Sequence, residues 1–148
     1  MDISSLLIEY HKEFRSSLFI SGFTLGAFLF SMKSVIIKIM KDDYYDRDEY
    51  KKLITERRSL GDSIGYYTQL INFSKLISKA IYLSFLSAIF QVTIGFIATP
   101  IPIFMCIATA FISWVLVATA IYYVSQNWIM SLEWEEVRSQ EKFDRKNK

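Results

Sequence analysis

The longest uncharged stretch of this chain limits what the chain can fold into. Residues 80–132 are 53 consecutive residues without an Asp, Glu, Lys, Arg or His. A helix crosses the hydrocarbon core of a bilayer with about 20 apolar residues, so this stretch is long enough for two crossings. Pro100 and Pro102 divide it, and proline is tolerated in the first turn of a helix but not inside one. We therefore predict a transmembrane helical hairpin of residues 80–98 and 103–125.

A second uncharged stretch, residues 16–32, lies between Arg15 and Lys33. At about 1.5 Å per residue, a helix of this length covers roughly 25 Å. The aliphatic stem of Lys33 lengthens the apolar segment while its ammonium group reaches the interface. Because apolar residues continue beyond it, we predict a first transmembrane helix over residues 16–40. A re-entrant segment that does not cross the bilayer is the alternative.

The composition agrees with a single-domain membrane protein. Of the 148 residues, 52% are hydrophobic and 22% are charged, and the charges are kept out of the two uncharged stretches. The net charge of +2 gives no reason to expect nucleic-acid binding. One cysteine excludes an intrachain disulfide, and the sequence contains no phosphate-binding or nucleophile motif. We expect no catalytic residue, no metal and no cofactor.

The polar segments complete the predicted fold. Residues 1–15 have the spacing of an interfacial amphipathic helix. Residues 42–79 must leave the membrane and return to it, so we predict a helical hairpin with arms at 43–60 and 63–79. The final segment, residues 126–148, is predicted to extend the last crossing as a helix. The expected fold is all-α, with three transmembrane helices extended into a cytoplasmic helical bundle.

The distribution of positive charges predicts the orientation. Residues 38–79 contain nine Lys and Arg and the tail from 126 contains five, whereas residues 99–102 contain none. Cytoplasmic loops carry the excess of positive charge, so the 42–79 segment and the C-terminus are predicted to be cytoplasmic. Three crossings then place the N-terminus outside, and a re-entrant first segment would place it inside. The expected location is the bacterial inner membrane.

A row of hydroxyl groups follows the first predicted crossing at spacings of three and four residues. It consists of Ser17, Ser21, Thr24 and Ser31, with Phe28 in the same row. In one interpretation these residues line the pore of a homo-oligomer, with Lys33 and Lys38 near its cytoplasmic mouth. In the other, the hydroxyls bond within or between packed helices and Lys33 only reaches the interface.

Small residues indicate where the helices pack against one another. Gly22 and Gly26 form a GxxxG pattern, and the last crossing carries small residues on one face, which allows close approach of helix backbones. The predicted packing residues of that face are Cys106, Ala110, Ser113 and Ala120.

The predicted cytoplasmic hairpin offers a docking surface for a protein partner. Its candidate contacts are Asp42, Asp43, Tyr44, Tyr45, Arg57 and Arg58. The acidic run lacks the glycine and the glutamate spacing of an EF-hand loop, so no calcium site is predicted. Helix capping and a solvated surface are the alternative roles of these charges.

These patterns lead to two functional hypotheses. The first is a homo-oligomeric membrane protein that forms a pore or ion-permeable assembly, in the manner of a bacterial or phage membrane effector. Small effectors of bacterial defence systems and three-span phage holins have a comparable layout, although no motif is shared. The second is a non-conducting subunit or immunity-type protein that binds another membrane protein.

Overall fold

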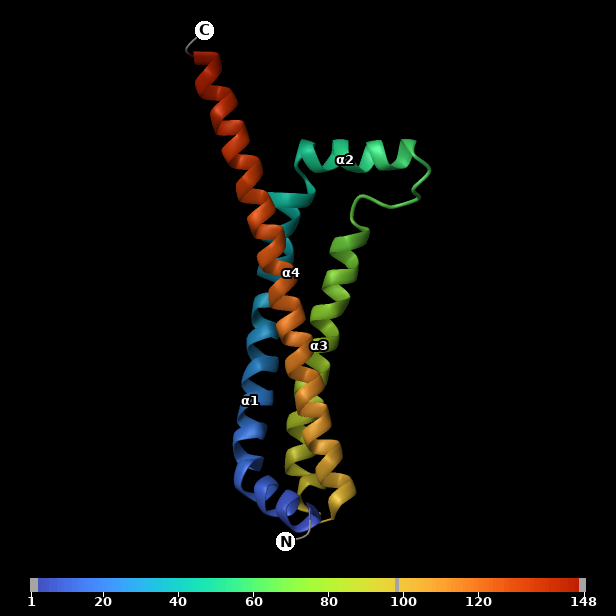
Figure 1. The fold of residues 1–148 in the computed structure, drawn as a ribbon, viewed down its shortest axis with the longest axis vertical. Coiled ribbons are helices and arrows are strands. Elements are labelled where there is room, and N and C mark those ends of the chain that lie inside the picture. Colours follow the sequence, from blue (N-terminus) through green and yellow to red (C-terminus); the bar gives the residue numbers. More distant parts are fainter. Residues whose placement is uncertain (1–2, 98, 147–148) are drawn as a thin grey trace. The chain divides into compact units, whose positions relative to one another are not determined.

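The computed structural model describes residues 3–97 and 99–146 of the chain. These residues contain no β-strand, which confirms the all-α fold (Figure 1). Helices α1, α3 and α4 are long and apolar enough to cross a membrane. The elements in order are α1 (Ile3–Met40), the π-helical turn η1 (Lys41–Tyr45), α2 (Asp48–Ser59), α3 (Thr68–Val92), the 3-10 turn η2 (Ile94–Phe96) and α4 (Pro100–Lys146).

Helices α1 and α4 extend beyond the predicted crossings, whereas α3 begins before its predicted crossing but ends at Val92, short of the predicted limit at residue 98. α1 includes most of the predicted amphipathic segment, and Figure 1 shows its first turns bent away from the rest of the helix. α4 begins at Pro100, where proline is tolerated because the first-turn amides have no intrahelical partner. It then runs without a break through the polar tail. The predicted helical extension of the last crossing is therefore part of α4 as far as Lys146.

The chain divides into two compact units. Unit 1 consists of Met1–Lys33 and Lys75–Ala120. Its core contains mainly small and branched apolar side chains from α1, α3 and α4, including Leu29, Ile77, Ile103 and Cys106. These buried positions recur every three or four residues along each helix, which is the period of one helix face.

Unit 2 consists of Ser34–Ser74 and Ile121–Lys148. Its core is aromatic and includes Tyr45, Tyr50 and Phe73. Each of these rings removes a large apolar area from water.

The connection between α1 and α3 differs from the predicted helical hairpin. The first arm is interrupted at Arg47, whose backbone is extended, so α2 has only 12 residues. Figure 1 shows α2 running away from α4 and not alongside the first turns of α3. Gly61 (φ 98°) follows the end of α2, as expected for a glycine after a helix. The second arm begins at Thr68 and not at residue 63.

Candidate functional site

One face of α1 is packed against α3 in unit 1. Gly22 and Gly26 are both buried. A Cβ atom at position 22 would lie 3.1 Å from the backbone oxygen of Ser84, and one at position 26 would lie 3.2 Å from the ring of Phe85. The GxxxG pattern therefore serves close packing between two helices of the same chain.

The predicted hydroxyl row lies away from this packed face. Ser17, Thr24 and Ser31 are exposed, and Ser21 is half-buried. Successive residues of a helix are separated by about 100°, so these positions point in nearly the opposite direction to the glycines. The Ser31 hydroxyl donates to the backbone oxygen of Phe28 at 2.8 Å. The Ser21 hydroxyl donates likewise to Leu18 at 3.0 Å.

Lys33, expected near the cytoplasmic mouth of the pore, lies on a different face of α1 from the hydroxyl row. It is half-buried, and its ammonium nitrogen donates to the hydroxyl of Ser78 on α3 at 2.7 Å. Position 33 follows Gly22, Gly26 and Leu29 at helical spacing, so it belongs to the packed face of α1. Lys38 is exposed.

The predicted packing face of α4 is buried in unit 1. Cys106, Ala110, Ser113 and Ala120 are each at most 4% exposed. The hydroxyls of Ser113 and Ser84 share a hydrogen bond of 2.7 Å. The side-chain nitrogen of Gln91 donates to the backbone oxygen of Cys106 at 3.1 Å. Such bonds satisfy polar groups that would otherwise be costly to bury between helices.

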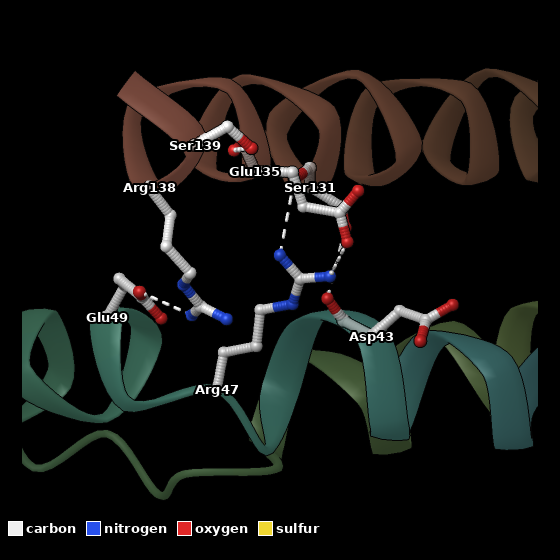
Figure 2. A network of polar contacts seen from close by, with 7 residues as sticks. All are labelled: Asp43, Arg47, Glu49, Ser131, Glu135, Arg138 and Ser139. Carbon is white, nitrogen blue, oxygen red and sulfur yellow. Dashed lines mark hydrogen bonds and ion pairs between the residues drawn. The ribbon is translucent and has the colours of Figure 1, made fainter. Parts of the chain in front are cut away.

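Two ion pairs join α4 to the N-terminal end of α2 (Figure 2). The Arg47 guanidinium lies 2.6 Å from a carboxylate oxygen of Glu135, and the Arg138 guanidinium lies 2.5 Å from Glu49. The Ser131 hydroxyl also donates to the backbone oxygen of Asp43 at 3.1 Å. Arg47 is the most enclosed member, with 13% of its side chain exposed. We call these residues of unit 2 the polar clamp.

An aromatic cluster lies beside the polar clamp. The rings of Tyr44 and Trp134 stack with centroids 4.9 Å apart, and Tyr45 and Tyr50 meet edge to face at 4.9 Å. Tyr44 and Tyr45 are 7% and 2% exposed, so they belong to the core of this chain. This corrects their assignment as surface contacts for a protein partner.

The charged docking candidates have different surroundings. Asp42, Asp43, Arg57 and Arg58 are exposed. The Arg58 guanidinium lies 4.3 Å from the centre of the Tyr66 ring and donates to the backbone oxygen of Ile64 at 2.9 Å. Arg58 therefore holds the turn after α2 in place, which gives it a role within the chain.

Asp46 connects the end of α1 to the start of α3 within unit 2. Its carboxylate accepts from the Lys41 ammonium at 2.6 Å and from the Tyr67 hydroxyl at 2.5 Å. These hydrogen bonds lower the pKa of the Asp46 carboxyl group, with the Lys41 bond contributing most. The hydrogen bond from Arg138 lowers the pKa of Glu49 in the same way.

Of the members of the polar clamp, sequence reasoning named only Asp43. Arg47 and Glu135 stand 88 positions apart, and periodicity within one helix carries no information about such a pair.

Within the described part of the chain, no three His, Cys, Asp or Glu side chains gather to hold a metal ion. Comparison of the chain with protein-family models, with curated proteins and with solved structures finds no match.

Proposed function

We propose that this chain assembles into a closed homo-oligomer in the bacterial inner membrane and forms an ion-permeable pore. The outward face of α1 would line the pore, with the 42–79 segment and the end of α4 in the cytoplasm. The observation that carries the proposal is the exposure of Ser17, Thr24 and Ser31 on the face of α1 opposite its glycines. The three helices long enough to cross a membrane support the insertion.

The exposed hydroxyl row favours water over lipid as its environment. Lipid tails offer hydroxyl groups no hydrogen-bond partner beyond their own helix, whereas a ring of hydroxyls from several protomers forms a hydrated path. The Ser31 hydroxyl uses its proton in the bond to Phe28, but its oxygen still accepts a hydrogen bond from water. Phe28, 56% exposed within this row, would form a hydrophobic constriction of the kind that gates by excluding water.

Two substitutions and a matched control test the pore. Thr24→Leu and Ser31→Leu should abolish dye or ion flux from liposomes while the native mass of the oligomer is unchanged. Thr119→Leu is the control, because its hydroxyl also bonds to its own helix, at Val115, but lies on α4. The proposal fails if the purified protein is a monomer in nanodiscs. It also fails if both α1 variants conduct like the wild type.

The reactivity of introduced cysteines tests independently whether the hydroxyl face of α1 is in contact with water. The native Cys106 is buried and free, so a Cys106→Ser background leaves no reactive thiol. Cysteines introduced at positions 17, 24 and 31 should react with a water-soluble thiol reagent in membranes. One introduced at Phe30, which is 70% exposed but lies roughly 100° or more around the helix from these positions, should react much more slowly. Equal reaction at all four positions would contradict a water-filled path along the hydroxyl row.

The second hypothesis is a non-conducting protein that binds a membrane partner through its cytoplasmic side. The exposed carboxylates of Asp42 and Asp43 remain available for it, whereas Tyr44 and Tyr45 do not because they are buried. Under this hypothesis, Asp42→Lys and Asp43→Lys should release a co-purifying protein, and the α1 variants should have no effect.

A further inference from the structure

A cavity of about 180 Å³ in unit 2 lies beside the polar clamp. This volume is several times the ~30 Å³ that one water molecule occupies in the liquid. One part of its wall is apolar and is formed by Ile36, Ile39, Val124 and Leu132. Another part carries the charges of Asp43, Arg47 and Glu135. The cavity therefore has an apolar and a charged side.

The residues of this cavity straddle the expected boundary of the membrane. The last uncharged residues before the polar segments are Met40 on α1 and Leu132 on α4, and both line the cavity. Trp128 also lines it and is 54% exposed. Tryptophan is enriched at the level of the lipid headgroups, so the apolar wall would meet acyl chains and the charged wall would meet headgroups.

The charges of the wall are not balanced. Arg47 and Glu135 neutralise each other through their ion pair of 2.6 Å. The Asp43 carboxylate has no partner among the described residues, and Figure 2 shows it outside the contacts of the clamp. Asp43 enters the network only through its backbone oxygen. The site therefore presents one uncompensated negative charge next to an arginine.

Arg47 retains capacity for an anion. Its guanidinium carries five N–H donors, and its contacts are to the Ser131 backbone oxygen and the Glu135 carboxylate. The remaining donors suit a phosphate oxygen, because the planar guanidinium binds phosphate with charge-assisted hydrogen bonds. A ligand with a cation, a phosphate and apolar chains would complement Asp43, Arg47 and the apolar wall at once.

We propose that this cavity binds a phospholipid with a primary ammonium headgroup, of the phosphatidylethanolamine type. The ammonium would donate hydrogen bonds to the Asp43 carboxylate, and the phosphate would accept from Arg47. The acyl chains would lie along Ile36, Ile39 and Val124. A primary ammonium fits better than a trimethylammonium group because a carboxylate accepts the N–H bonds that only the former can donate. The site is separate from the α1 face proposed to line the pore.

Native mass spectrometry of the purified full-length protein tests the site. The protein in mild detergent is given equal amounts of phosphatidylethanolamine, phosphatidylcholine and phosphatidylglycerol with identical oleoyl chains. Retention of the first should exceed that of the second by about tenfold, which corresponds to about 1.4 kcal/mol. Asp43→Asn should remove most of this preference. Asp42→Asn is the matched control, because Asp42 is an exposed neighbour that does not line the cavity.

Three outcomes would overturn the proposal. Equal retention of the three lipids would show that the charged wall recognises no headgroup. A preference for phosphatidylglycerol or phosphatidylcholine would assign the site to a different chemistry. An unchanged preference in Asp43→Asn would place the recognition elsewhere. Circular dichroism of each variant checks that it is folded. Because lipid retention is measured without any flux assay, a failure of the lipid-site proposal leaves the pore proposal standing.

Discussion

The two glycines of α1 provide a sharp test of the packing in unit 1. Gly22→Ala and Gly26→Ala make the same chemical change about one helical turn apart, so the gain in helix propensity, about 1 kcal/mol, is the same for both. The variants differ in what the added methyl group meets. At position 22 the nearest atoms are the backbone oxygen of Ser84 and the backbone nitrogen of Ala88, at 3.1 and 3.4 Å. At position 26 the nearest atoms belong to the Phe85 ring.

The difference between these neighbouring atoms sets the expected change in stability of each variant. A backbone carbonyl can move only if α3 shifts, and overpacking of this kind costs about 1–3 kcal/mol. The Phe85 ring can move by a few tenths of an ångström through its own side-chain torsions, which should cost less than about 1 kcal/mol. After the shared gain, Gly22→Ala should destabilise by about 0–2 kcal/mol, and Gly26→Ala should be neutral or slightly stabilising.

Unfolding of both variants in the same mixed detergent micelles measures this difference. The two midpoints are compared with the wild type at a fixed protein concentration, so that a change in oligomerisation affects all three proteins equally. A loss of stability for Gly26→Ala equal to or greater than that for Gly22→Ala would refute the assignment of Ser84 as the closer, unyielding neighbour.

Two further predictions concern unit 2. Glu49→Arg should destabilise the contact between α2 and α4 because it faces Arg138 with a like charge, and Glu49→Arg combined with Arg138→Glu should recover about 0.2–1 kcal/mol in a thermal-unfolding cycle. The lowered pKa values of Asp46 and Glu49 mean that both carboxylates stabilise the folded state above the usual carboxyl pKa of about 4. This stability is lost as the pH falls further, through their folded pKa values. Trp134 fluorescence should report the loss below about pH 4, and an unchanged signal down to pH 2 would contradict it.

The apolar pattern predicted the helices well because it depends on local sequence. The two uncharged stretches and Pro100 give three long helices, and the described residues contain three helices of that length and apolarity. The first arm was predicted to end at residue 60, and the structure ends α2 at Ser59. The position of the break at Arg47 was not predictable, because its extended backbone accompanies contacts with distant residues of α4.

What the sequence by itself determined is which segments are helical and which are apolar enough to enter a membrane, because both properties arise from residues close together in the chain. Only the tertiary structure decided what each face meets. It placed the glycines of α1 against α3, bound Lys33 to Ser78 and buried Tyr44 and Tyr45. Helical periodicity tells which residues share a face, but the partner of that face depends on the packing of distant segments.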